Sequence, residues 1–113
     1  MRMWMVNPRI MCRQHLLGEH LEIHMFAGTI REKKSLVGYV ENNLFEAGSL
    51  KVRHDRLVKE MVRRGYDHKS VLRKPNMKYL SKYERKSKVD KEKSLDDLIC
   101  RCTECRRNYR KGK

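Results

Sequence analysis

Acidic residues are few in this sequence. Its 113 residues include 14 aspartates and glutamates against 28 lysines and arginines, which leaves a net charge of +14. That excess is larger than solubility requires, and it predicts a polyanionic partner, with nucleic acid as the first choice. A structural protein of the ribosomal type would be equally basic. Such proteins tend to carry long basic tails, whereas these charges are spread along helical patterns.

Long hydrophobic runs are missing as well. Charged side chains interrupt the apolar stretches of residues 1–26, so we expect no signal peptide. No segment approaches the ~20 apolar residues that a membrane span requires. We therefore expect a cytoplasmic protein without a membrane partner, in which the cysteines stay reduced.

Aromatic residues make up only 7% of the chain and hydrophobic residues 39%, which limits the protein to one thin core. A chain of this length buries roughly 60–70% of its unfolded surface. We find no alternating strand pattern and no internal repeat. The composition therefore predicts one all-α domain over residues 1–113, and we expect a monomer.

Three main helices are expected, with an N-terminal arm at residues 1–6 packed against the first and third of them. The first helix begins at Asn7 and Pro8, where asparagine caps the helix and proline occupies its first turn. It runs to Met25 or Phe26. Residues 29–32 then form a capping box for a continuation toward residue 44.

The second helix spans residues 50–64 and ends at Gly65, a residue suited to a left-handed helix stop. The third spans residues 94–109. Between them, residues 67–93 form a basic, weakly structured connection, because lysines are dense there and Pro75 and Asn76 interrupt a helical pattern.

One face of the first helix carries the residues of most chemical interest. Met11, His15, Gly18, Glu22 and Met25 recur at helical spacing and form one stripe. Glu22 is a carboxylate on an otherwise apolar stripe, which is unusual for a solvated surface charge. Gly18 costs roughly 1 kcal/mol relative to alanine inside a helix. We expect a close approach of the N-terminal arm to offset that cost.

The α-amine is the second reactive group, provided that Met1 is retained before the bulky Arg2. An α-amine is far less basic than a lysine side chain and is therefore available as a neutral nucleophile. An amine, a carboxylate and a basic surface are the groups that imine chemistry on a DNA sugar requires.

The segment Gln14–Glu22, with the pattern Gln-His-Leu-x-x-Glu-x-x-Glu, resembles the pyrimidine-dimer DNA glycosylases and AP lyases of the phage endonuclease V type. The separation of Met1 and Glu22 along the chain also matches that family, and Arg2 matches its second residue. The similarity extends through Gly28 to residues 30–31. It resumes at residues 53–66, which look like the family's second helix, so it covers about half of the chain.

The resemblance implies a mechanism without cofactor or metal. The amine of Met1 would attack the anomeric carbon of a damaged pyrimidine nucleoside, displace the base and form an imine. Glu22 would stabilise the cationic sugar and assist the β-elimination that breaks the strand. The partner would be double-stranded DNA, and a cyclobutane pyrimidine dimer is the expected lesion. We expect the DNA contacts to come from Arg2, Arg13, His15, His20, His24, Arg101, Arg106, Arg107 and Arg110.

Two features depart from the family. Its arginines one residue before and three residues after the catalytic glutamate are Leu21 and Met25 here, and its aromatic-rich C-terminal tail is reduced to Tyr109. The same chemistry on another damaged or modified base is therefore one alternative. A non-catalytic basic DNA- or RNA-binding domain is another, in which Glu22 would pair with an arginine and Met1 would be an unordered start.

The chain has four cysteines. Cys100, Cys102 and Cys105 lie close together, and zinc or an iron–sulfur cluster would need a fourth ligand. Cys12 supplies it only if the first and third helices meet there. The helical spacing of Cys102 and Cys105 favours buried free thiols instead. His20 and His24 lie one turn apart, but we expect no zinc site there either, and so no metal in this protein.

Overall fold

The computed structural model describes residues 1–68 and 70–112, and all regular elements in these ranges are helical, which confirms the all-α fold. Four helices are sizeable: α1 (Arg13–Arg31), α3 (Leu50–Arg63), α5 (Lys91–Arg101) and α6 (Thr103–Lys111). Four single turns join them: η1 (Pro8–Ile10), α2 (Val37–Glu41), η2 (Ala47–Ser49) and α4 (Lys82–Arg85). The described part of the chain holds no helix long and apolar enough to span a bilayer.

The first helix begins later than the sequence suggests. Asn7 caps only the short turn η1, where its side chain accepts a hydrogen bond from the Arg9 amide at 3.1 Å. Cys12 caps α1 instead, and its sulfur accepts from the amide of His15 at 3.4 Å. A thiol in the place of the usual serine or aspartate is a poor sequence signal for a helix start.

The capping box expected at residues 29–32 is wrong. Helix α1 continues without a break through Gly28 to Arg31. The hydroxyl of Thr29 lies inside the helix and donates to the carbonyl of Met25 at 3.0 Å. A threonine hydroxyl has this internal alternative to capping, so the sequence pattern alone did not distinguish the two.

The second expected helix is confirmed as α3, and Gly65 ends it as predicted. Gly65 has φ +83°, and its amide donates to the carbonyl of Val62 at 2.9 Å. The amide of Tyr66 donates to the carbonyl of Met61, also at 2.9 Å. These two bonds form a Schellman motif, which requires the left-handed conformation that glycine adopts freely.

The third expected helix is divided into two helices, because the helical conformation is interrupted at Cys102. This residue is extended, with φ −116° and ψ 112°, so that it both ends α5 and caps α6. The connection expected at residues 67–93 is mostly irregular where it is described, and residue 69 lies outside the described residues. It contains the turn α4, whose Ser81 and Glu84 form a capping box, and it ends in the first turn of α5.

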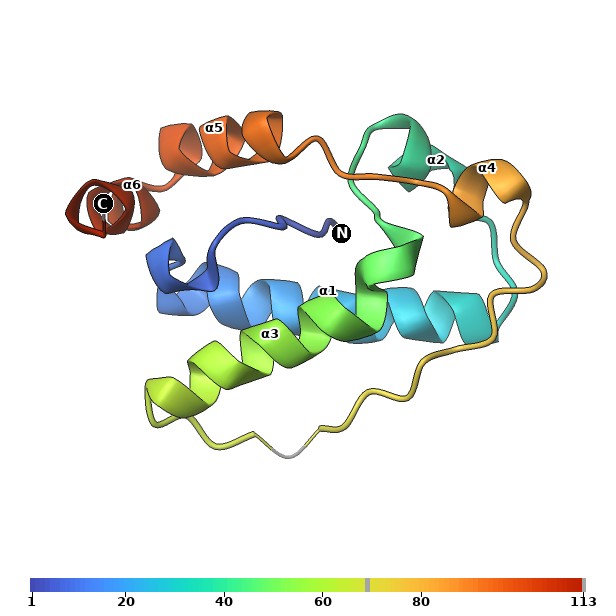
Figure 1. The fold of residues 1–113 in the computed structure, drawn as a ribbon, viewed down its shortest axis with the longest axis horizontal. Helices are drawn as coiled ribbons and strands as arrows, with labels where there is room; N and C mark the ends of the chain where they lie inside the picture. Colours follow the sequence, from blue (N-terminus) through green and yellow to red (C-terminus); the bar gives the residue numbers. More distant parts are fainter. Residues whose placement is uncertain (69, 113) are drawn as a thin grey trace.

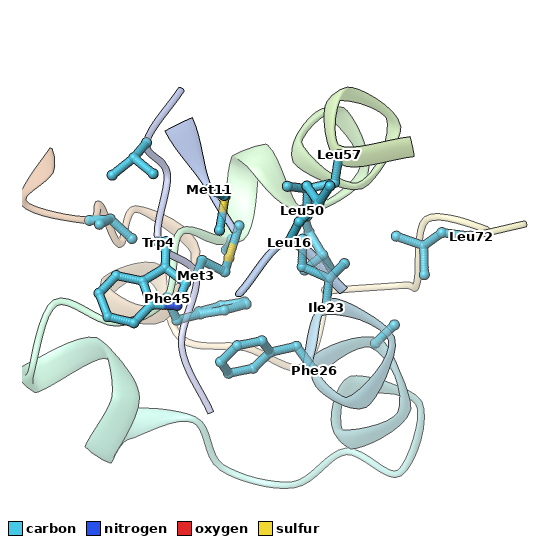
Figure 2. Packing of buried hydrophobic residues seen from close by; sticks show 14 of the residues in the cluster. Met3, Trp4, Met11, Leu16, Ile23, Phe26, Phe45, Leu50, Leu57 and Leu72 are labelled. Atoms are coloured by element: carbon cyan, nitrogen blue, oxygen red, sulfur yellow. The ribbon is translucent and has the colours of Figure 1, made fainter. Parts of the chain in front are cut away.

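The N-terminal arm lies between α1 and α5 (Figure 1). Figure 2 shows Met3 and Trp4 of the arm packed with Phe45 and Phe26 in the buried core. Met3 donates its amide to the carbonyl of Leu44 at 2.7 Å, so the arm is tied to the α2–η2 connection as well.

The arm turns sharply at Met5, which has φ 57°, a value that is rare for a residue with a side chain. The carbonyls on both sides are held. That of Trp4 accepts from the Ser94 hydroxyl at 2.5 Å, and that of Val6 accepts from Arg53 Nη1 at 2.7 Å. These two bonds, from α5 and α3, maintain the strained turn and give the arm one path across the protein.

Candidate active site

The two glutamates of the segment 14–22 have opposite surroundings. Glu19 is fully buried and pairs with Arg53 through two bonds, Nε to Oε2 at 2.6 Å and Nη2 to Oε1 at 2.8 Å. Because the same guanidinium also donates to Val6, this pair fixes the arm against α1 and α3. Glu19 is therefore a structural residue, occupied on both of its oxygens.

Glu22 lies one turn further along α1 and is only partly buried. Among the residues that the structure describes, none forms a hydrogen bond or ion pair with its carboxylate. The arginine pairing that would make Glu22 a structural charge is not found there. Its neighbours Leu21 and Met25 are 60% and 48% exposed, so apolar surface adjoins the carboxylate.

The close approach expected at Gly18 is wrong. A methyl group added to this glycine would meet nothing within 4 Å outside its own helix. The stripe that contains it also changes character along α1, from the buried Met11 to the half-exposed Met25. Gly18 therefore leaves open space one turn before Glu22.

Met1 is ordered and half-buried against the core. It lines a hollow of about 460 Å³ between the arm, the α2–η2 connection and α5. Two predicted DNA-contacting residues, Arg2 and Arg101, share this hollow, whereas Glu22 is not part of its lining. The full lining consists of Met1, Arg2, Asn42, Asn43, Leu44, Asp90, Lys93, Ser94, Asp97 and Arg101.

Arg2 is engaged within the protein. Its guanidinium carbon lies 3.7 Å from the ring centre of Trp4, and its nitrogens reach Ser94 at 3.2 Å and Asp97 at 3.6 Å. Burial lowers the pKa of Arg2, and the nearby Asp97 opposes this shift. Only 14% of the Arg2 side chain is exposed, so in this structure Arg2 mainly links the arm to α5.

The segment 53–66, which resembles the family's second helix, also holds the turn η1 that follows the arm. Arg64 pairs with Glu60, Nε to Oε2 at 2.7 Å, and its Nη2 donates to the carbonyls of Pro8 and Met11 at 3.0 and 2.7 Å. Arg64 thus binds both ends of the turn η1. Sequence reasoning missed this role because a carbonyl acceptor leaves no trace in the sequence.

Four of the five histidines gather between α1, α3 and the segment after α3. The Nε2 atoms of His20 and His68 are 3.0 Å apart, and the rings of His20, His24 and His54 lie within 5.0 Å of one another. The Nε2 atoms of His24 and His54 are buried and have no partner among the described residues. Burial, followed by the neighbouring histidines, lowers the pKa of His20 to about 4.

His15 lies among cysteines instead of in that group. Its Nδ1 is 3.1 Å from the sulfur of Cys12 and 3.7 Å from that of Cys105, and Trp4 of the arm packs edge-on against its ring. Burial raises the pKa of the Cys105 thiol to about 12. Cys100, the other cysteine of the predicted cluster, is exposed.

The remaining predicted DNA-contacting arginines lie mainly at the surface. Arg101, Arg107 and Arg110 are exposed on α5 and α6, whereas Arg106 is half-buried and donates to a carbonyl of α5 at 3.3 Å. Arg13 is exposed at the start of α1 and stacks over Tyr66, with 4.7 Å between the guanidinium carbon and the ring centre.

The comparison that decides the family is a match to the pyrimidine dimer DNA glycosylases over residues 1–74. The chain belongs to this family. The match covers the arm, α1, α2 and α3, and it ends before α4. No curated protein and no solved structure matches the chain. Family membership supports a DNA-repair function of the glycosylase type, with DNA as the partner.

Proposed function

We propose that this protein excises a damaged pyrimidine from double-stranded DNA and cleaves the strand at the resulting abasic sugar, through an imine on the amine of Met1. The observation that carries the proposal is Glu22. It is a partly accessible carboxylate without a partner among the described residues, in a segment whose other glutamate is buried and paired. A carboxylate left unpaired in a strongly basic chain is available to a developing positive charge.

The proposed reaction begins at C1′ of the sugar that carries the damaged base. The nitrogen of Met1 bonds to C1′ of the sugar, the bond from C1′ to the base breaks, and the base leaves with the electron pair and takes up a proton. Loss of the amine proton and opening of the sugar ring produce the imine. Glu22 first stabilises the cationic sugar and then accepts the proton from C2′, so that the bond between C3′ and oxygen breaks.

The apolar residues beside Glu22 bear on the substrate. An extruded base needs a surface to replace its lost stacking, and the exposed Leu21 and Met25 provide one where related proteins carry arginines. The open space over Gly18 adds room on the same helix. A cyclobutane dimer remains the first candidate, and another damaged base with an apolar face is the second. We expect the protein to act as a monomer.

Borohydride trapping tests the chemistry. The protein is incubated with duplex DNA that contains one abasic site, in the presence of the reductant, and the expected product is a covalent adduct that mass spectrometry maps to the amine of Met1. An N-terminal extension should abolish the adduct and leave DNA binding intact. Salt-sensitive binding without any adduct would identify a non-catalytic DNA-binding domain and refute the lyase mechanism.

Glu22→Gln tests the carboxylate. We expect DNA affinity within about twofold of the unmodified protein and strand cleavage reduced by 10²-fold or more, typical of the loss of a general base. Glu41→Gln removes an exposed carboxylate on α2 and serves as the matched control. Equal cleavage by Glu22→Gln and Glu41→Gln would show that Glu22 takes no part in the reaction.

A further inference from the structure

Three cysteines and one histidine, from two segments about 90 residues apart in the chain, lie close together. The sulfurs of Cys12, Cys102 and Cys105 and a ring nitrogen of His15 all lie within 4.8 Å of one another. Cys12 and His15 are at the start of α1, and Cys102 and Cys105 at the start of α6, so that each pair has the spacing Cys-x-x-ligand at a helix N-terminus.

Two of the distances between these atoms match a tetrahedral ion. Zinc–sulfur bonds of about 2.3 Å and zinc–nitrogen bonds of about 2.0–2.1 Å place two sulfurs about 3.8 Å apart, and a sulfur and a nitrogen about 3.5–3.6 Å apart. The sulfurs of Cys12 and Cys102 are 3.8 Å apart, and the sulfur of Cys105 is 3.7 Å from His15 Nδ1. The distance from Cys12 to His15, 3.1 Å, would lengthen by about 0.4 Å on binding. A sulfur pair at 3.8 Å is far from the roughly 2.05 Å of a disulfide.

The backbone is arranged to support negatively charged sulfurs. The amide of His15 donates to Cys12 at 3.4 Å, that of Cys105 donates to Cys102 at 3.4 Å, and that of Cys12 donates to Cys105 at 3.2 Å. Each of the three sulfurs therefore accepts one backbone hydrogen bond. The positive ends of α1 and α6 add to this stabilisation, since two of the sulfurs are helix caps.

We propose that Cys12, Cys102 and Cys105, through Sγ, and His15, through Nδ1, bind one zinc ion. Three thiolates and one imidazole form a ligand set typical of structural zinc, and four protein ligands leave no position for water or substrate. Binding displaces three thiol protons, and no electron is transferred. The proposal replaces the expectation of free thiols, excludes Cys100 from the site, and gives His15 a role in the protein instead of on DNA.

The ion would join two parts of the chain, of which the first matches the glycosylase family. Cys12 and His15 lie within residues 1–74, which match the glycosylase family, whereas Cys102 and Cys105 lie beyond them. Helix α5, which ends at Cys102, also carries Ser94 and Asp97, the partners of the arm. A zinc ion would therefore hold α5 and α6 in place against the arm that presents Met1.

Metal content and cobalt spectroscopy test the site. Protein purified without added metal is expected to contain one zinc per chain by elemental mass spectrometry. Because His20, His54 and His68 also have the spacing to hold a metal ion, the count alone does not assign the ion. Cobalt exchanged into the unmodified protein should therefore show the thiolate-to-cobalt charge-transfer and tetrahedral ligand-field bands of a sulfur-rich site. Their absence, or a Cys12–Cys102 disulfide found instead, would overturn the proposal.

Two single variants assign the ligands. Cys102→Ser is expected to lower zinc affinity at least 100-fold, measured by competition with a chromophoric chelator, and to remove most of the cobalt charge-transfer intensity. Cys100→Ser changes a cysteine two residues away that is exposed and outside the cluster, and it should leave both unchanged. Zinc affinity that is unaltered in Cys102→Ser, or lost equally in both variants, would contradict the assigned ligands. The cobalt spectrum of the unmodified protein keeps the test valid even if Cys102→Ser folds poorly.

Discussion

Glu19 and Glu22 are one helical turn apart on α1, and burial assigns them different roles. Both oxygens of Glu19 are used by Arg53 inside the protein, where an unpaired charge would be strongly destabilising. Glu22 lies on the partly exposed side of α1, beside the exposed Leu21 and Met25. At the scale of the residue, the candidate catalytic carboxylate is therefore the one that forms no hydrogen bond or ion pair with the described residues.

Gly18 provides a first prediction at this scale. Gly18→Ala should raise the free energy of unfolding by about 0.5–1 kcal/mol, because alanine favours the helix and the added methyl group meets open space. If DNA occupies that space, strand cleavage should nevertheless fall. Urea denaturation and an abasic-site cleavage assay measure the two effects.

Gly28→Ala is the matched control, since Gly28 lies in the same helix and its added methyl group also meets nothing within 4 Å. We expect a similar gain in stability and unchanged cleavage. If Gly18→Ala cleaves as well as Gly28→Ala, the space over Gly18 is not part of the substrate site.

His20 provides a second prediction, on pH. Its pKa is about 4 in the folded protein against 6.5 in an unfolded chain, so between these values the unfolded chain binds the extra proton. The contribution of neutral His20 to the free energy of unfolding is therefore fully present above pH 6.5, and it is lost as the pH drops toward 4. A shift of this size corresponds to about 3 kcal/mol without screening, and the exposed side of the ring reduces the expected loss to about 1–2 kcal/mol.

Urea titrations between pH 4 and 7 measure this loss, and His20→Gln should flatten the curve. The groups facing His20 are His24, His54 and His68, with Arg31 acting on His24 and Asp55 bonded to His54. A pH profile of His20→Gln that superimposes on that of the unmodified protein would place the acid sensitivity elsewhere.

At the scale of the element, α3 is the support on which the arm is built. Arg53 of α3 and the following residue Arg64 donate to four carbonyls of residues 6–11. In this protein, residues of the segment 53–66 therefore position the N-terminal part of the chain. That placement is a condition for an amine at Met1 to act as a nucleophile at a defined point.

Arg64→Ala should cost about 1–3 kcal/mol of stability, because the carbonyls of Pro8 and Met11 lose their donor, and it should also slow borohydride trapping. Arg63→Ala is the control. Arg63 also pairs with Glu60, but its side chain is 52% exposed, so less than about 0.5 kcal/mol is expected. Equal costs would mean that the pairing with Glu60, and not the bonds to η1, stabilises this region.

At the scale of the whole molecule, the net charge of +14 governs how the protein meets DNA. Every phosphate contact releases counterions, so affinity falls linearly with salt on logarithmic axes, with a slope of about −0.9 per contact on duplex DNA. Arg101 is the predicted DNA-contacting residue that lines the hollow beside Met1 and remains exposed.

Arg101→Gln should therefore reduce that slope by about 1, measured by fluorescence anisotropy on an abasic duplex between 50 and 200 mM salt. Arg56→Gln removes an equal charge from an exposed position on α3 and should change the slope by less. If the two variants behave alike, binding responds to total charge and not to a surface near Met1.

The sequence by itself determined the all-α class and helix α3 with its glycine stop. These features depend on helical periodicity and on turn chemistry within a few residues, which a sequence displays directly. It also singled out Glu22 and Met1, by a spacing that resembles a known family, and their roles remain predictions. The start of α1 was misplaced because a cysteine caps it.

Only the tertiary structure decided which side chains meet across the chain. It distinguished the buried Glu19 from the partly exposed Glu22 and left open space over Gly18. It also divided the expected third helix at Cys102, whose sulfur lies beside that of Cys12. The physical reason is the same in each case. Packing brings groups 34 to 90 residues apart within a few ångströms, and the environment that results is not a property of either segment alone.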